Sequence, residues 1–222
     1  MKRLVLLVRH GQTTWNVEHR LPGHLPGIPL TALGREQAEL LAVGLRPLPI
    51  SAIISSPLER AVETARYLDE GRGLNIQLDP ALIDLDSGPW AGQIGEVLLA
   101  NDPARRAFVR NPTITPPGVE SFPELQKRVV TAMQHWLSDD AIGSCPAFVT
   151  HDDVIKVLLA YYMGLPLEHA RAIVVGNASA SVVLLEDDHP ARILATSWSP
   201  SPEWLKPSVR SQSSDTEAEK TA

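Results

Sequence analysis

The sequence has few cysteines, few aromatic residues and no long hydrophobic run. Cys145 is the one cysteine among 222 residues, so an intramolecular disulfide framework is excluded. A chain of this length can bury a sufficient core without disulfide or metal support. The N-terminal apolar run from Leu4 to Val8 ends at Arg9, which makes it too short for a signal peptide or a membrane span. We therefore expect a cytoplasmic protein that does not contact a membrane.

Positive charge is also scarce. Lys and Arg number 20 against 26 Asp and Glu, which gives a formal net charge of -6. Such a chain has no general attraction for nucleic acid, so an anionic ligand would need arginines concentrated at one site. No His-x-His or Cys-x-x-Cys spacing typical of a metal site occurs. We expect no metal, no other cofactor and no nucleic-acid partner.

Strand-like and helix-like patterns alternate along the chain and predict an α/β fold, with helices on both faces of a mostly parallel sheet. Strands are expected at 4–8, 50–55, 147–150, 172–175, 181–185 and 192–197. Helices are expected at 31–46, from the Ser56-Pro57-Leu58-Glu59 capping box onward, and near 93–100, 103–109, 125–136 and 154–161.

The domain organisation follows from composition. Residues 1–199 form one predicted domain, and the irregular stretch at about 82–118, rich in Gly, Pro and Asp, is expected to be a partly helical insertion that covers the active site. The polar segment 200–222 is expected to be a disordered tail.

Charged and polar side chains follow three predicted strands. Arg9 and His10 end the first strand, the second runs into the helix that carries Arg60, and a third ends at His151 and Asp152. The carboxyl ends of parallel strands lie along one edge of a sheet, so these groups could meet in one pocket.

Two arginines and two histidines at one site suit a phosphoryl group. Guanidinium groups neutralise its anionic oxygens with paired hydrogen bonds, and a neutral imidazole can attack phosphorus. Taken singly, His10 fits a structural histidine and Arg60 a solvated surface arginine. Only their combination indicates phosphoryl chemistry.

The chain resembles the histidine phosphatase superfamily, in the branch that contains cofactor-dependent phosphoglycerate mutases and many small-molecule phosphatases. The matching motifs, in chain order, are Leu7-Val8-Arg9-His10-Gly11-Gln12-Thr13 with Asn16, Pro29-Leu30-Thr31 with Gly34 and Gln37-Ala38, Ser55-Ser56-Pro57-Leu58 with Arg60-Ala61 and Glu63-Thr64-Ala65, Gly88, Trp90 and Gly92, Gly118 with Glu120-Ser121-Phe122, Thr150-His151, and Asn177 with Ser179. Their joint occurrence in order is specific, and it implies a phosphoglycerate mutase-like fold.

The resemblance implies a role for each matching residue. His10 would be the nucleophile, while Arg9, Arg60 and His151 would bind the phosphoryl oxygens and stabilise the transition state. Asn16 matches a phosphate ligand of the family. The resemblance also leaves a homodimer open.

The residue that protonates the leaving group departs from the family pattern. Asp84 stands where glutamate is common, and an aspartate reaches one methylene less far. Asp152 competes with it, because a His-Asp pair carries the proton donor in the superfamily's other branch. Asp152 could equally be a helix N-cap, with Asp153 in the first turn of the same helix. We expect Asp84 to be the acid.

The expected activity is hydrolysis of small phosphorylated metabolites through a phosphohistidine at His10. A mutase would need cationic side chains in the insertion, where Arg105, Arg106 and Arg110 are the candidates and also fit one solvated helix face. Mutase-type phosphoryl transfer and a catalytically silent phosphate-binding module are the alternatives.

Overall fold

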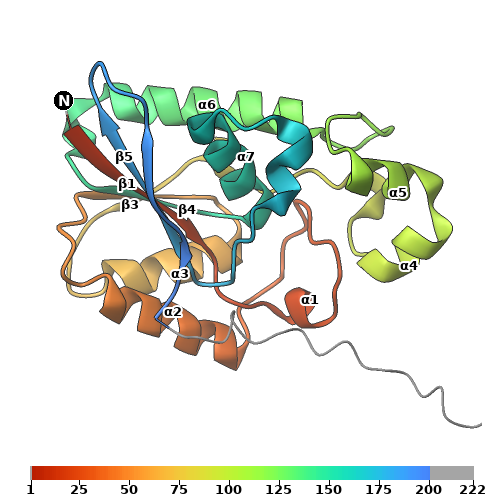
Figure 1. Ribbon diagram of the computed structural model, residues 1–222. Coiled ribbons are helices and arrows are strands. Elements are labelled where there is room, and N and C mark those ends of the chain that lie inside the picture. The colour runs from red at the N-terminus through yellow and green to blue at the C-terminus, as the bar shows by residue number, and fades with distance from the viewer. Residues whose placement is uncertain (1, 201–222) are drawn as a thin grey trace, which may run out of the picture.

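The computed structural model describes residues 2–200 (Figure 1). Residues 201–222 of the expected tail lie outside the described part. The strands are β1 (Lys2–Arg9), β2 (Ala52–Ser55), β3 (Ile76–Leu78), β4 (Pro146–Thr150), β5 (Ala180–Glu186) and β6 (Arg192–Trp198). The α-helices are α1 (Thr14–Val17), α2 (Ala32–Gly44), α3 (Glu59–Asp69), α4 (Gly95–Asn101), α5 (Pro103–Arg110), α6 (Phe122–Ser138) and α7 (Asp152–Met163).

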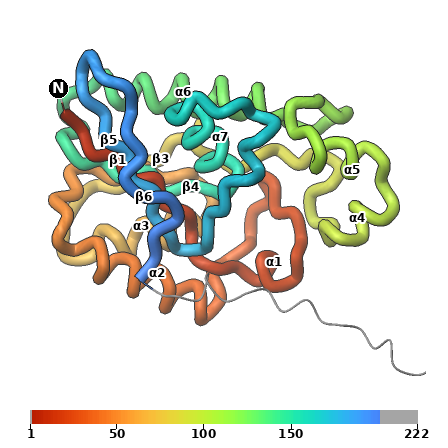
Figure 2. Tube along the Cα trace, viewed as in Figure 1, coloured from red at the N-terminus to blue at the C-terminus, as the bar shows by residue number. Residues whose placement is uncertain are grey.

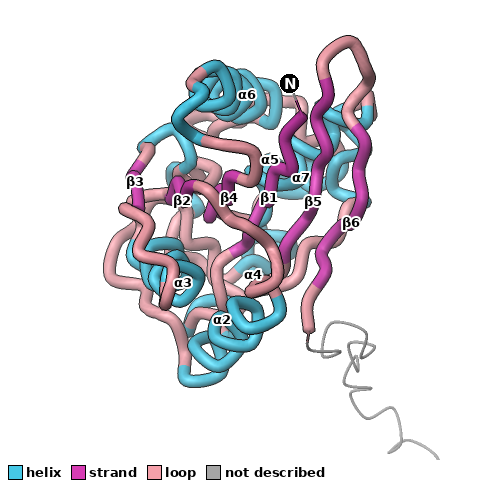
Figure 3. Tube along the Cα trace, turned by 90° about the vertical axis from the view of Figure 1, so that its left-hand side faces the viewer, coloured by secondary structure: helices cyan, strands magenta, loops and turns pink. Residues whose placement is uncertain are grey.

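The strands form one six-stranded sheet in the order β3-β2-β4-β1-β5-β6 (Figure 3). The pairs β1–β4, β2–β4 and β2–β3 are parallel, whereas β5 runs antiparallel to both β1 and β6. Helices α6 and α7 cover one face of the sheet, and α2 and α3 cover the other (Figure 1). The prediction of an α/β fold with a mostly parallel sheet is confirmed.

Strand β1 is buried on both faces of the sheet. Val5 and Leu7 pack into the apolar cluster on the α6 and α7 side, while Leu6 and Val8 pack into the cluster on the α2 and α3 side. Successive strand residues point to opposite faces, so a continuous apolar run serves both layers. The strand ends at Arg9, and His10 is the first residue of the loop that follows.

One predicted strand is wrong and one observed strand was not predicted. The expected strand at 172–175 does not form, since a 3-10 helix covers Leu167–Ala172 and Val174 beyond it is 70 % exposed. Conversely, the three-residue strand β3 was not expected. Val and Ile at 173–175 favour a strand locally, but no neighbouring strand pairs with them, so tertiary context overrides propensity.

The insertion is partly helical, as predicted. It contains a 3-10 helix at Gly88–Trp90, then α4 and α5, and it packs on the α6 and α7 cluster through Trp90, Leu98 and Phe108. The insertion and the α1 loop lie on the same side of the molecule, next to the end of the sheet at which β1 finishes (Figure 2). None of the described helices is long and apolar enough to cross a membrane.

Candidate active site

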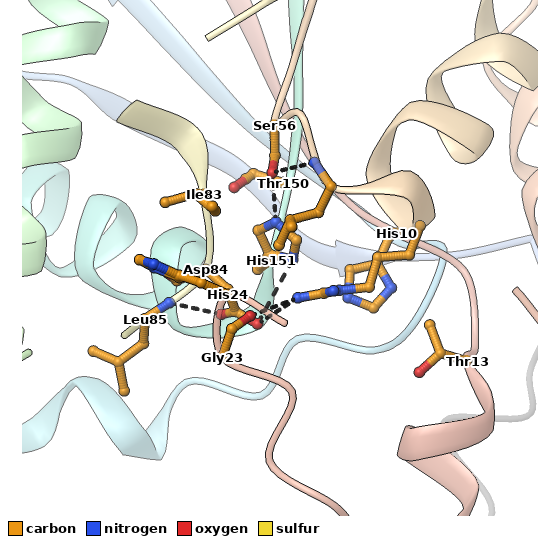
Figure 4. Close-up of polar contacts among 12 residues, drawn as sticks. His10, Thr13, Gly23, His24, Ser56, Ile83, Asp84, Leu85, Thr150 and His151 are labelled. Carbon is orange, nitrogen blue, oxygen red and sulfur yellow. Dashed lines mark hydrogen bonds and ion pairs between the residues drawn. The ribbon is translucent and has the colours of Figure 1, made fainter. Parts of the chain in front are cut away.

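Four of the predicted site residues lie together near the carboxyl ends of β1, β2 and β4 (Figure 4). They are His10, Arg60, Asp84 and His151. The rings of His10 and His151 are 5.2 Å apart between centroids. Asp84 lies with its Oδ2 3.1 Å from Nη2 of Arg60 and 3.7 Å from Nδ1 of His151. Groups that are far apart in the chain thus form one cluster, as the strand-end argument expected.

The ring of His10 is buried and held in one orientation. Its Nδ1 lies 2.7 Å from the carbonyl oxygen of Gly11, and a carbonyl oxygen only accepts hydrogen bonds, so Nδ1 carries the proton and Nε2 keeps its lone pair. Burial, followed by the charges of Arg60 and Arg9, lowers the pKa of His10 well below its usual value. The imidazole is therefore neutral at physiological pH and has a free basic nitrogen.

The loop after His10 needs glycine for steric reasons. A Cβ on Gly11 would lie 2.3 Å from the carbonyl oxygen of Gly34 in α2, which is closer than any real contact. The Gly11 amide also donates to Thr64 Oγ1 in α3 at 3.1 Å. The loop is thereby pressed between α2 and α3, and this fixes the position of His10.

His151 is fully buried between Ser56 and Asp84. Its Nε2 lies 2.8 Å from Ser56 Oγ, while Nδ1 has no hydrogen-bond partner and faces the carboxylate of Asp84. Burial, followed by the charges of Arg60, His10, Arg9 and His24, lowers the pKa of His151 well below its usual value. A proton on Nδ1 suits this setting, because the Ser56 hydroxyl can donate to Nε2.

Ser56 therefore does not have the role that the sequence suggested. Helix α3 begins at Glu59 with Leu58 as its N-cap and without a capping side chain, so the predicted capping box is wrong. The Ser56 hydroxyl instead contacts His151, with the Leu58 amide at 3.4 Å. Its place directly after a strand end was the one signal available in the sequence.

Arg60 and Arg9 bring unsatisfied donors to the site. The fully buried Arg60 donates through Nη2 to the Gly23 carbonyl and to Asp84, both at 3.1 Å, while its Nε and Nη1 are buried without a partner. Arg9 donates to the carbonyl of Val175 at 2.5 Å, and its Nε is also buried without a partner. Burial lowers the pKa of Arg60. Unpaired buried donors are costly, and an oxyanion would satisfy them.

Asn16 is held beside the His10 loop. Its Oδ1 accepts from the amide and the hydroxyl of Thr13, at 2.9 and 3.0 Å, and from Asn177 Nδ2 at 3.2 Å. Asn177 also donates to the His10 carbonyl at 3.3 Å. Because Oδ1 is fully engaged, the Asn16 Nδ2 group is left as the donor for a ligand.

The carboxyl group of Asp84 is mostly buried, with 14 % of the side chain exposed. Burial is the main cause that raises its pKa; the charges of Asp153 and Asp152 add to this effect, and Arg60 opposes it. One oxygen accepts from Arg60 and the other from the Leu85 amide at 2.9 Å. A carboxyl group with a raised pKa can hold and release a proton closer to neutral pH.

Asp152 has a different partner. Its carboxylate forms an ion pair with Lys156 at 2.6 Å, one turn along α7. His151, not Asp152, is the N-cap of this helix, so the interpretation of Asp152 as the cap is wrong, while Asp153 does lie in the first turn. Among the described residues, only Asp84 of the two candidate acids forms ion pairs with Arg60 and His151.

The backbone of Asp84 is clamped by a residue that the sequence did not indicate. Arg128 of α6 makes two hydrogen bonds to Glu120, at 2.8 and 2.9 Å, and donates to the carbonyl oxygens of Ile83 and Asp84 at 3.0 and 3.2 Å. His24 Nε2 also lies 2.7 Å from the Asp84 carbonyl. Nothing in the sequence distinguishes Arg128 from a surface arginine.

The three arginines of the insertion are not equivalent. Arg105 is buried, with 9 % of its surface exposed, which corrects the interpretation of one solvated helix face. Arg106 donates to the carbonyls of Leu99 and Ala100, and Arg110 is exposed. In the part of the chain that the structure describes, no group of three or more His, Cys, Asp or Glu side chains could hold a metal ion.

Comparisons with known proteins identify relatives of this chain. A model of the histidine phosphatase superfamily (branch 1) matches residues 5–196. "Probable phosphoglycerate mutase GpmB" of Enterobacter sp. (strain 638) is 36 % identical over 196 residues, 87 % of this chain and 89 % of that protein.

Solved structures of related proteins share the fold. Mycobacterial glucosyl-3-phosphoglycerate phosphatase superimposes with a TM-score of 0.78 at 30 % identity, over 90 % of this chain and 100 % of that one. YhfR of Bacillus stearothermophilus gives a TM-score of 0.81 at 31 % identity, over 88 % and 96 % of the two chains. The chain belongs to the histidine phosphatase superfamily, in its first branch, and is an enzyme of that superfamily.

Proposed function

We propose that this protein is a phosphatase, which hydrolyses small phosphate monoesters through a phosphohistidine at His10. The observation that carries the proposal is the state of His10, whose Nδ1 is bonded to the Gly11 carbonyl and whose Nε2 is free next to buried arginines. A neutral imidazole held in this way is a nucleophile that needs no separate base.

In the first step, Nε2 of His10 attacks phosphorus and the bond from phosphorus to the ester oxygen breaks. Asp84, whose pKa is raised by burial, gives a proton to the departing oxygen, which leaves as an alcohol. The unpaired donors of Arg9 and Arg60, with Asn16 and His151, bind the other phosphoryl oxygens and neutralise their charge.

In the second step, water attacks the phosphohistidine. The Asp84 carboxylate accepts a proton from this water, the bond between phosphorus and nitrogen breaks, and its electron pair returns to Nε2 of His10. Inorganic phosphate leaves, and Asp84 is again protonated for the next cycle. No metal or cofactor takes part in either step.

Mutase-type transfer is the second candidate, because the curated relative carries a mutase name. The two reactions share the first step and differ in what accepts the phosphoryl group from His10. We favour water, since two of the three insertion arginines are engaged or enclosed: Arg106 binds backbone carbonyls and Arg105 is buried.

Two assays on the purified chain test this proposal. Incubation with p-nitrophenyl phosphate should release nitrophenol and leave an acid-labile, base-stable phosphoprotein on rapid quenching. His10→Asn should abolish both signals, whereas His189→Asn, at an exposed histidine, should change neither. Normal turnover by His10→Asn would refute the phosphohistidine.

A third assay separates the two reactions. With 3-phosphoglycerate and its bisphosphate primer, a phosphatase releases inorganic phosphate, and a mutase produces 2-phosphoglycerate. Production of 2-phosphoglycerate faster than phosphate would replace our proposal with the mutase. A protein that binds these compounds but forms neither product would be the silent phosphate-binding module.

A further inference from the structure

His151 is a neutral histidine, and what its ring can do depends on which nitrogen carries the proton. Burial, followed by the charge of Arg60, lowers the pKa of His151 well below its usual value. A neutral imidazole has one N–H donor and one acceptor, and the two can exchange places. An anionic phosphoryl oxygen accepts hydrogen bonds, so the ring stabilises it only if the proton is on the nitrogen that faces the site.

The nitrogen that faces the active site is Nδ1 of His151. It is buried without a hydrogen-bond partner and lies 3.7 Å from Oδ2 of Asp84, the group that we assign to the leaving oxygen. On the opposite side of the ring, Nε2 lies 2.8 Å from Ser56 Oγ (Figure 4). The ring thus stands between a hydroxyl group and the acid, and the hydroxyl contacts the nitrogen that is turned away from the acid.

Ser56 is fully buried, and its hydroxyl has one acceptor for its proton. The Leu58 amide approaches Oγ at 3.4 Å, but this amide is itself a donor. Within residues 2–200, no carbonyl or carboxylate oxygen accepts a hydrogen bond from Ser56 Oγ, so Nε2 of His151 is the acceptor. Because Nε2 must keep its lone pair to accept, the ring proton lies on Nδ1.

The backbone around the serine and the histidine is fixed without help from the hydroxyl. The Ser56 amide donates to the Val149 carbonyl at 2.9 Å, which ties the end of β2 to β4. Thr150 Oγ1 donates to the Leu82 carbonyl at 2.6 Å, which ties the loop of the acid to the end of β4. Rotation of the His151 ring and the choice of its tautomer are the freedoms that remain, and the hydroxyl restricts both.

We propose that Ser56 is a positioning residue, which holds the proton of His151 on Nδ1 and so makes this ring a hydrogen-bond donor to the phosphoryl group in the transition state. This role rests on the proposed function for the identity of the group that the ring binds. It accounts for a buried hydroxyl directly after β2, at a position where the helix that follows does not use it as a cap.

Nuclear magnetic resonance tests the tautomer of His151 without any substrate. In isotopically labelled protein, long-range proton–nitrogen spectra distinguish the protonated ring nitrogen from the bare one, and His151→Gln identifies the signals by their loss. We expect the wild-type protein to carry the proton on Nδ1 alone. Ser56→Ala should give a mixture of the two tautomers, and Ser56→Thr, which keeps the hydroxyl, should restore the single one.

Anion binding measures the consequence for the transition state. Orthovanadate becomes five-coordinate when it bonds to His10 and so resembles the transition state, whereas inorganic phosphate remains tetrahedral. In Ser56→Ala, the dissociation constant of vanadate should rise about tenfold relative to that of phosphate, as the loss of one hydrogen bond to a charged group would produce. Ser55→Ala is the matched control, because Ser55 is equally buried but donates to the Ser56 carbonyl at 2.9 Å. It should change neither the tautomer nor the ratio.

The outcomes separate this role of Ser56 from the proposed function. A proton on Nε2 of His151 in the wild-type protein, or one unchanged tautomer in Ser56→Ala, would overturn the role even if the enzyme hydrolyses p-nitrophenyl phosphate. Unchanged or equally weakened binding of the two anions would also overturn it, as would the same effects in Ser55→Ala, since these results indicate packing alone. The expected tautomer and ratio in a protein that never hydrolyses an ester would overturn the phosphatase alone.

Discussion

Asp84 has the setting of a proton donor that acts on a leaving group. Asp84→Asn removes the transferable proton while keeping the shape of the side chain. We expect the kcat for an alkyl phosphate to fall about 100-fold or more, and that for p-nitrophenyl phosphate to fall much less, because nitrophenolate leaves without a proton. Steady-state kinetics on both substrates measure this difference.

Asp152→Asn is the matched control for this substitution. The Asp152 carboxylate pairs with Lys156 at 2.6 Å and, unlike that of Asp84, forms no ion pair with Arg60 or His151, so its loss should change kcat less than about threefold for both substrates. If Asp152→Asn showed the leaving-group dependence and Asp84→Asn did not, the acid would be Asp152, and our assignment would be wrong.

At the scale of residues, the sequence predicts those active-site side chains that directly follow strands or lie within a motif of several matching residues. His10, Arg60 and His151 are of this kind, and the structure brings them together. Ser56 could not be assigned, because a serine before Pro57 suits a helix cap as well as a histidine contact. Arg105 could not be recognised as buried, since the ring of Trp90, 5.3 Å from its Cζ, comes from another segment of the chain.

At the scale of elements, long periodic segments are predictable and short ones are not. The amphipathic helix α6 contains enough apolar positions to reveal its period, and the strand β1 is marked by a continuous apolar run. Strand β3 has three residues, of which two are exposed, and depends on pairing with β2. The loop that carries Asp84 has no period at all, so its position depends on the side chains that clamp it.

The hydrogen bonds by which Arg128 holds the Asp84 loop lead to a prediction at the scale of elements. Arg128 links α6 to the carbonyls of Ile83 and Asp84, and Arg128→Lys cannot keep the paired contact with Glu120. We expect kcat for an alkyl phosphate to fall about tenfold, with a smaller effect on p-nitrophenyl phosphate, because the acid is displaced. Steady-state kinetics on the two substrates measure both effects.

Lys127→Arg, at the neighbouring position of α6, is the control for this experiment and should change neither rate. A purely structural role of Arg128 would lower the thermal midpoint of unfolding and reduce both rates by the same factor. That pattern would contradict a positioning role, so the ratio between the two substrates is the decisive readout.

At the scale of the whole molecule, the site makes stability depend on pH. His10 and His151 are buried, and their pKa values in the folded state lie well below the usual 6.5. As the pH falls below about 6.5, the unfolded chain binds protons at these histidines and the folded chain does not. Stability that is complete above this pH is therefore lost progressively on acidification.

The expected slope follows from proton linkage. Each buried histidine contributes up to about 1.4 kcal/mol per pH unit between 6.5 and its lowered folded pKa, so the two together give up to about 2.8 kcal/mol per unit. Asp84 acts in the opposite direction, because its raised folded pKa reduces stability as the pH rises above about 3.8. Urea unfolding between pH 8 and pH 5 measures the net slope.

Substituting one histidine separates this effect from general acid sensitivity. His10→Asn should reduce the slope of stability against pH by up to about 1.4 kcal/mol per unit, the contribution of one proton, because asparagine does not titrate. His189→Asn, at an exposed position, should leave the slope unchanged. An unaltered slope in His10→Asn would mean that folding does not lower the pKa of His10. The same result would contradict the buried, uncharged setting of His10 on which the proposed reaction depends, so a stability measurement tests that setting without any substrate.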